Sequence, residues 1–222
     1  MSRILLVRHG QASFGAADYD NLSATGREQS RVLGAALAAR DLRPDVLVGG
    51  EMKRHAQTAA GVLDGSGWST DLTVDSGWNE FDHLQVLAVH SQPSTAEGES
   101  EKAAFQRWFE EATLRWTSGD HDDDYDESFV TFTARVETAL AQLVRSLPPR
   151  GTAVVLTSGG PIAWAVASLL ADATAARTDL WLRLNPVSVN TGVSTVVCGS
   201  RATTLVSFNA HDHLPPDLIT YR

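Results

Sequence analysis

An arginine and a histidine stand together near the start of the chain, directly after a short apolar run. Residues 4–7 read Ile-Leu-Leu-Val, and Arg8, His9 and Gly10 follow them. An uninterrupted apolar run of this length is typical of a strand that is buried on both faces of a parallel sheet. Ligands of open α/β sheets collect at the carboxyl ends of the strands. We therefore expect a cation and an imidazole at a ligand-binding edge of a sheet.

These residue types suit the transfer of a phosphoryl group. A neutral histidine held in one tautomer can attack phosphorus, and the planar guanidinium of an arginine binds phosphoryl oxygens through two parallel hydrogen bonds. A second arginine, Arg54, stands near the start of a helix that follows another short strand. Gly10 is expected to let the chain turn sharply and a ligand approach the backbone. We predict that His9 is a nucleophile toward phosphorus and that Arg8 holds the phosphoryl oxygens.

Strands alternate with helices along most of the chain. The first helix is expected to begin at Thr25 as its N-cap, with Glu28 completing a capping box, and to stop near residues 43–44. The alternation predicts an α/β fold, a three-layer α/β/α sandwich with a mostly parallel central sheet. The strands are predicted at residues 4–7, 46–48, 72–74, 153–157, 192–198 and 203–208, and the further helices at residues 52–63, 80–89, 97–116, 129–147 and 161–170.

The stretch from residue 75 to residue 128 differs from its surroundings. It holds three of the six tryptophans and the acidic run from Asp120 to Glu127. We predict one domain over residues 1–222, in which residues 75–128 form a helical lid or cap insertion over the carboxyl edge of the sheet. The acidic run lacks the ligand spacing of an EF-hand, so we interpret it as a solvated loop rather than a metal site.

Composition limits the classes of protein to which the chain can belong. The formal net charge is −9, from 18 basic and 27 acidic residues, which argues against a nucleic-acid-binding role. The single cysteine, Cys198, cannot form an internal disulfide, which suits a reducing compartment. Neither a membrane-spanning run nor a signal peptide is evident. We therefore expect a cytoplasmic protein that binds neither nucleic acid nor membranes.

Three segments together resemble the histidine phosphatase superfamily, which includes the cofactor-dependent phosphoglycerate mutases. They read LLVRHGQA, LSATGREQ and KRHAQTA, in that order, within residues 3–63. Weaker matches follow at residues 78–80, at residues 158–160 and in the C-terminal FNAHDHL. The resemblance implies a phosphohistidine mechanism that needs no metal and no cofactor. The residues that it marks are His9 as the phosphorylated group, Arg8 and Arg54 as phosphate ligands, Glu80 as proton donor, and Gln11 and Ser13 as contacts of the substrate phosphate.

One position departs from the family pattern. Where the family usually has a second histidine after a late strand, this chain has Ser158, followed by Gly159. A serine hydroxyl donates one hydrogen bond to phosphate but carries no positive charge. Backbone N–H groups of the helix that starts near Gly159 would add donors. We expect His211 or His213 to supply part of the missing contact, and we expect His55 on the exposed side of its helix, without a role.

The leading hypothesis is a phosphomonoester hydrolase that acts through a phosphohistidine on His9. For the leaving-group acid, Asp82 is the second choice after Glu80. A phosphoglycerate mutase-type transfer is one alternative, although the insertion has few cations for a substrate carboxylate. A domain that only binds a phosphorylated ligand is another, because Ser158 replaces the histidine. A serine hydrolase fits poorly, since the G-x-S-x-G motif is absent. Partners would be a small phosphorylated metabolite or a phosphoprotein, and the sequence leaves a homodimer open.

Overall fold

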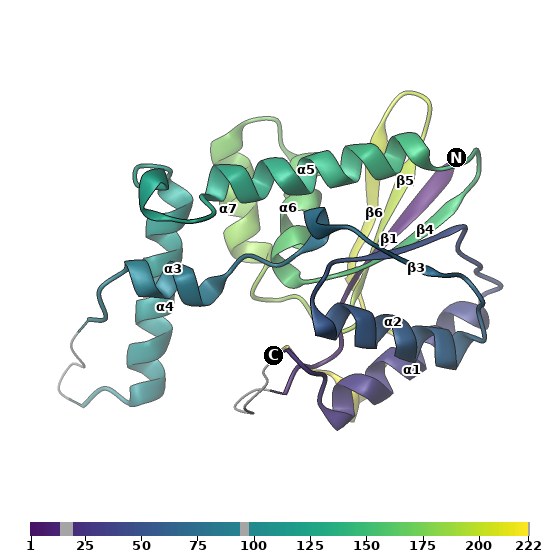
Figure 1. Cartoon of the computed structure of the whole chain (residues 1–222), viewed down its shortest axis with the longest axis horizontal. Helices are drawn as coiled ribbons and strands as arrows, with labels where there is room; N and C mark the ends of the chain where they lie inside the picture. The colour runs from purple at the N-terminus through teal and green to yellow at the C-terminus, as the bar shows by residue number, and fades with distance from the viewer. Residues whose placement is uncertain (14–19, 94–97, 222) are drawn as a thin grey trace. The chain divides into compact units, whose positions relative to one another are not determined.

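A mixed six-stranded sheet forms the centre of the part of the chain that the computed structural model describes, residues 1–13, 20–93 and 98–221 (Figure 1). The strand order is β3-β2-β4-β1-β5-β6. The first four strands in this order run parallel, whereas β5 is antiparallel to β1 and β6 is antiparallel to β5. The strands are β1 (Ser2–Arg8), β2 (Val46–Gly49), β3 (Leu72–Val74), β4 (Thr152–Thr157), β5 (Val193–Cys198) and β6 (Thr203–Ala210).

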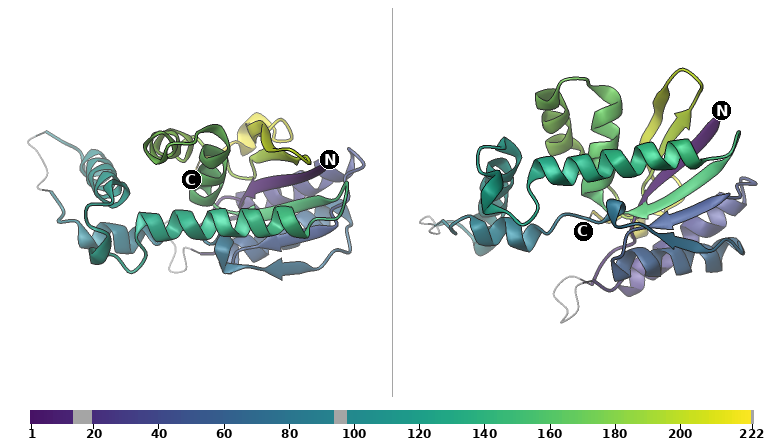
Figure 2. Two further views of the ribbon diagram at one scale, coloured as in Figure 1. Left: turned by 90° about the horizontal axis from the view of Figure 1, so that it is seen from above. Right: turned by 45° about the horizontal axis from the view of Figure 1, so that its top comes forward.

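Helices cover both faces of this sheet, as Figures 1 and 2 show. Crossover connections between parallel strands are usually right-handed, so the direction of a crossover along the sheet decides which face its helix covers. The crossovers through α1 and α2 lead toward β3, and the crossover through α5 leads back to β4, so α5 is expected on the face opposite α1 and α2. The predicted α/β/α sandwich with a mostly parallel sheet is therefore confirmed. The helices are α1 (Ala24–Ala38), α2 (Lys53–Ser66), α3 (His83–Val89), α4 (Glu101–Ser118), α5 (Phe129–Ser146), α6 (Gly159–Leu170) and α7 (Thr174–Leu184). The sequence pattern gave no sign of α7.

The sheet is held by its buried central strands. Ile4, Leu6 and Val7 of β1 expose no surface, and every residue of β4 is buried. Because successive side chains of a strand point to opposite faces, these strands feed the core on both sides of the sheet. The apolar run at residues 4–7 was the right signal for such a strand. Among the described helices, none is long and apolar enough to cross a lipid bilayer.

The described chain divides into two compact units. One combines Met1–Glu80 with Val136–Arg222 and contains the sheet, and the other is Phe81–Arg135. The insertion expected at residues 75–128 overlaps the second unit. Its position over the carboxyl edge and the single-domain description stay predictions.

The second unit has an aromatic core of its own. Phe81 stacks on Trp116 with ring centroids 4.8 Å apart, and Phe132 lies 5.7 Å from Phe81. The acidic run that follows α4 is anchored to α5 by an ion pair, in which Arg135 Nε lies 2.7 Å from Glu127 Oε1. Aromatic contacts and ion pairs therefore hold this unit together.

Three local expectations about the first helix were wrong, among them its end, which lies at Ala38 and not near residues 43–44. The N-cap of α1 is Ser23, whose Oγ accepts the Gly26 N–H at 3.0 Å, and Thr25 lies inside the helix. Glu28 bonds Arg31 instead of closing a capping box. A side chain on Gly10 would come within 2.3 Å of the Gly26 carbonyl oxygen, so glycine is needed there because α1 packs against it.

Candidate active site

The backbone around His9 is fixed by three neighbouring segments. The His9 N–H donates to the Thr157 carbonyl at the end of β4, at 2.8 Å, and Asn190 Nδ2 donates to the His9 carbonyl at 3.1 Å. The Gly10 N–H donates to Thr58 Oγ1 in α2 at 3.1 Å. These bonds place the His9 imidazole where β1, β4 and α2 meet.

The His9 ring is buried and held in one tautomer. Its Nδ1 lies 2.7 Å from the Gly10 carbonyl oxygen, and since a carbonyl can only accept, Nδ1 carries the hydrogen. Nε2 therefore carries the lone pair. The pKa of His9 is held well below its usual value of 6.5, chiefly by burial and then by the charges of Arg54 and Arg8. The imidazole is neutral at neutral pH, with Nε2 as its nucleophilic atom.

Arg8 and Arg54 flank this imidazole. Arg8 Nη1 donates to the carbonyl oxygens of Ser188 and Tyr221, the second at 2.8 Å. Arg54 is buried, and its Nη1 donates to Asp20 Oδ1 at 2.7 Å. The Nε of Arg54 is buried and has no acceptor within the described residues. A buried guanidinium N–H without an acceptor costs free energy, so this donor suits an anion oxygen.

Asp20 was not singled out in the sequence. Besides pairing with Arg54, its Oδ2 accepts the Lys53 N–H at 2.8 Å, at the first residue of α2. A carboxylate is stabilised at a helix N-terminus by the unpaired N–H groups and the helix dipole. The signal was weak because Asp20 stands in a polar loop thirty-odd residues before its partners. An anion that binds Arg54 would share that side chain with Asp20.

Ser158, Gly159 and Glu80 meet at the N-terminus of α6. Ser158 is its N-cap residue and is fully buried, and the Gly160 N–H donates to Glu80 Oε2 at 3.1 Å. A Cβ on Gly159 would lie 3.8 Å from Arg8 Nε, so this residue is close to Arg8. The strand end that carries His9 and the helix end that carries Glu80 are therefore neighbours.

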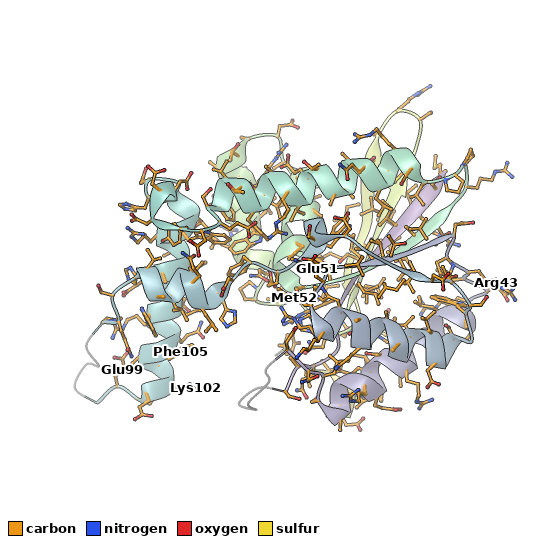
Figure 3. The ribbon with its side chains drawn as sticks, in the orientation of Figure 1. Arg43, Glu51, Met52, Glu99, Lys102 and Phe105 are labelled. Carbon is orange, nitrogen blue, oxygen red and sulfur yellow. The ribbon has the colours of Figure 1, made fainter. Side chains whose placement is uncertain are left out.

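The connection from β2 to α2 is tied to the segment before Glu80. Figure 3 labels Glu51 and Met52 in this connection. The Glu51 N–H donates to Asn79 Oδ1 at 2.7 Å, and Asn79 Nδ2 donates to Glu51 Oε2 at 2.8 Å. This exchange of hydrogen bonds fixes Glu80 relative to the start of α2.

His55 lies inside the site, and the expectation that it is exposed was wrong. It has no exposed surface, and its ring centroid is 5.9 Å from that of His9. Its Nε2 lies 2.8 Å from Ser158 Oγ. Helical periodicity could have revealed this, because residues 55, 59 and 62 form one stripe, and Ala59 and Val62 are clear core residues. We call Arg8, His9, Arg54, His55 and Ser158 the His9 cluster.

Gln11 and Ser13 stand at the start of the loop after β1. Gln11 Oε1 accepts a hydrogen bond from Ser23 Oγ at 2.8 Å, and the Ser13 N–H donates to the Asn21 carbonyl at 2.8 Å. Residues 14–19, which continue the predicted loop, lie outside the described residues. A substrate contact of Gln11 or Ser13 remains a prediction.

His211 is not brought to the His9 cluster. Strand register places Val7 opposite Val193 and Val193 opposite Ala210, so His211 lies level with the end of β1 but two strands away, roughly 10 Å. Its Nδ1 donates to the Asn209 carbonyl at 2.7 Å. In the described chain no hydrogen bond or ring contact joins it to the cluster. Nor does that part of the chain hold a group of three His, Cys, Asp or Glu side chains suited to a metal.

The described site has a buried neutral imidazole close to two arginines at the carboxyl edge of an α/β sheet, the arrangement that the sequence predicted. The family model described as "Histidine phosphatase superfamily (branch 1)" matches residues 4–211. The chain therefore belongs to the histidine phosphatase superfamily, as the three sequence segments indicated. No curated protein matches the chain significantly.

Solved structures share the fold along nearly the whole chain. Bacillus stearothermophilus YhfR has a TM-score of 0.71 at 18% identity, covering 96% of this chain and 99% of its own. A mutant of the Entamoeba histolytica phosphoserine phosphatase in complex with phosphoserine has a TM-score of 0.69 at 18% identity, covering 97% and 100%. A mycobacterial glucosyl-3-phosphoglycerate phosphatase in complex with VO3 has a TM-score of 0.64 at 22% identity, covering 95% and 100%. At these identities the likeness establishes the fold.

Proposed function

We propose that this protein is a phosphomonoester hydrolase in which His9 carries the phosphoryl group between two half-reactions. One observation carries the proposal: the Gly10 carbonyl holds Nδ1 of a buried, neutral His9, so that the lone pair of Nε2 is available beside Arg8 and Arg54. Two neighbouring arginines stabilise charge on the phosphoryl oxygens in the transition state. Family membership and the phosphatases among the structural neighbours support it.

In the first half-reaction, the lone pair of His9 Nε2 forms a bond to phosphorus while the ester P–O bond breaks. Glu80 gives its proton to the departing oxygen, and the alcohol leaves. The Gly160 N–H holds one oxygen of Glu80 in place for this step. The buried Nε of Arg54 gains an acceptor when the phosphoryl oxygens arrive.

In the second half-reaction, water attacks phosphorus and the P–N bond breaks. The Glu80 carboxylate takes a proton from the water, inorganic phosphate leaves, and His9 recovers its lone pair. A single carboxyl group thus serves as acid and then as base. The arginines supply the positive charge, so the proposed reaction needs no metal. We propose a small phosphorylated metabolite or a phosphoprotein as the substrate.

A phosphate-release screen tests this function. Wild type, His9→Gln and His121→Gln are assayed on p-nitrophenyl phosphate, phosphoserine, sugar phosphates and a phosphopeptide; His121 is an exposed imidazole in the acidic run and serves as the matched control. We expect wild type and His121→Gln to release phosphate and His9→Gln to be slower by about a thousandfold or more. Transfer to a second hydroxyl without phosphate release would establish a mutase instead. Binding of these compounds without turnover by wild type would establish a binding domain.

A further inference from the structure

The fully buried pair of His55 and Ser158 has no place in the mechanism above. The two side chains come from α2 and from the start of α6, 103 positions apart, and His55 Nε2 lies 2.8 Å from Ser158 Oγ. Neither residue exposes any surface. Buried polar groups cost free energy unless they are hydrogen-bonded, so each of these side chains depends on the other.

Ser158 does not do what a serine at its position ordinarily does. An N-cap serine usually accepts an N–H from the first turn of its helix, which stabilises the helix by about 1 kcal/mol. Ser158 is the N-cap of α6 but makes no such bond, and Glu80 Oε2 accepts the Gly160 N–H in its place. The Ser158 hydroxyl is therefore available for other contacts, and in this structure it meets His55.

The surroundings of His55 indicate which nitrogen carries its hydrogen. Burial, and then the charge of Arg54, lower the pKa of His55 to about 3, so the ring is neutral and has one N–H. A hydrogen-bonding contact of the ring with the Gly50 backbone raises this pKa, but no bond from Nδ1 meets full hydrogen-bond geometry within the described residues. Buried N–H groups without an acceptor are rarer than buried acceptors without a donor. With the hydrogen on Nε2, the ring donates to Ser158 Oγ, which lies at hydrogen-bond distance.

This placement has a direct chemical consequence for Ser158. A hydroxyl has one hydrogen and two lone pairs, so when it accepts the Nε2–H of His55, its own hydrogen can be donated elsewhere. The chain places Ser158 directly after Thr157, whose carbonyl accepts the His9 N–H at 2.8 Å. The His55 ring lies 5.9 Å from the His9 ring. Ser158 therefore lies next to the strand end that carries His9, and its hydroxyl contacts the ring that neighbours the His9 imidazole.

We propose that His55 is a positioning residue of the phosphoryl pocket: its Nε2–H holds the Ser158 oxygen, so that the Ser158 hydroxyl donates to an oxygen of the phosphoryl group at His9. The inference rests on the proposed function. His55 acts through Ser158 and touches no reacting atom. In a protein with a histidine directly after β4, that one side chain could contact the phosphoryl group. Here two residues share this task, Ser158 after β4 and His55 in α2.

Gly50 is part of the same arrangement. A Cβ on Gly50 would lie 2.5 Å from His55 Nδ1, so the absence of a side chain there makes room for the imidazole. The ring is thereby confined between the end of β2 and Ser158. Confinement matters because a positioning residue has to present its N–H in one orientation.

Kinetics of Ser158→Ala, His55→Leu and His55→Gln test the proposal. A lost hydrogen bond to a charged phosphoryl oxygen costs roughly tenfold to a hundredfold in kcat/KM. We expect Ser158→Ala and His55→Leu to lose that factor and the double variant to lose no more than Ser158→Ala alone. His55→Gln keeps an N–H donor and should recover most of the activity. Multiplied losses in the double variant, or equal losses in His55→Leu and His55→Gln, would overturn the proposal.

A spectroscopic measurement keeps the proposal testable if His55→Leu fails to fold. In wild type with orthovanadate, the ¹⁵N shifts of the His55 ring should report hydrogen on Nε2 and none on Nδ1, and hydrogen on Nδ1 alone would contradict the proposal. The phosphate-release assay of His9→Gln separates the role of the His55–Ser158 pair from the proposed hydrolase function. Turnover that is lost in His9→Gln but unchanged in Ser158→Ala refutes only the role of the pair. Turnover that survives in His9→Gln and is abolished in Ser158→Ala refutes both and points to Ser158 as the nucleophile.

Discussion

Acidification should destabilise the fold through His55. In the native protein the pKa of His55 is about 3, whereas an unperturbed histidine in the unfolded chain has a pKa near 6.5. Between these two values the unfolded chain binds a proton that the native chain excludes. Stability therefore rises with pH across this window and is lost as the pH falls below about 6.5.

The size of this effect follows from the two pKa values. Between pH 7 and pH 5 the unfolded histidine goes from about a quarter protonated to almost fully protonated, while the native one stays neutral. The linkage relation then gives a loss of about 2 kcal/mol from His55 alone. Replacing His55 with Gln removes that part of the pH dependence. Urea unfolding followed by circular dichroism at pH 7, 6 and 5 measures it as the change in unfolding free energy.

Val62→Ala is the matched control for this experiment. Val62 is fully buried on the same helix, so its truncation lowers stability at every pH and leaves the pH dependence as in wild type. His55→Gln should instead show a pH dependence that is smaller by about 2 kcal/mol between pH 7 and pH 5. Equal pH dependence in wild type and His55→Gln would refute the assignment of His55 as a buried neutral imidazole.

Three further predictions concern the site. Glu80→Gln should slow formation of the phosphoenzyme from alkyl phosphomonoesters by about a hundredfold or more, but formation from p-nitrophenyl phosphate much less, because nitrophenolate leaves without a proton. Equal losses in this first step with both substrates would remove Glu80 as the acid. A Cβ on Gly50 would lie 2.5 Å from His55 Nδ1 and 2.7 Å from Asn79 Oδ1. Gly50→Ala should therefore lower the unfolding free energy in urea by about 1–3 kcal/mol and also lower kcat/KM. Wild-type values for both quantities would contradict the packing at Gly50. Dialysis against EDTA should leave kcat/KM unchanged, and a loss restored by adding a divalent metal would overturn the metal-free mechanism.

The fold was readable from the sequence because its signals are local. The apolar run before Arg8 is a strand buried on both faces, and the alternation of strands and helices matches the sheet. The misplaced N-cap shows the limit of local reasoning. Thr25 and Glu28 have the right spacing for a capping box, but Ser23 also bonds Gln11 across the loop, and that tertiary contact helps to set the start of the helix.

The sequence predicted only part of the candidate site. The other part consists of side-chain pairs that come from segments far apart in the chain. Arg8 ends β1, His9 follows it directly, and Arg54 lies in the first turn of the helix after β2, positions that the sequence displays. The pairing of His55 with Ser158 joins α2 to the residue that precedes α6, and that of Asp20 with Arg54 joins a loop to a helix. Neither pairing has a spacing that a sequence motif could record. His211 looked like a substitute for a missing group because it is a histidine, but strand order places it two strands from β1.

Trapping the phosphoenzyme identifies the residue that carries the phosphoryl group. Wild type is mixed with a ³²P-labelled phosphomonoester that it hydrolyses, quenched in base within milliseconds, digested and mapped by mass spectrometry. We expect up to one phosphoryl group per chain, stable to base, labile to acid and located on His9, with no label in His9→Gln. Full turnover in His9→Gln, or label on Ser158 instead, would contradict this expectation.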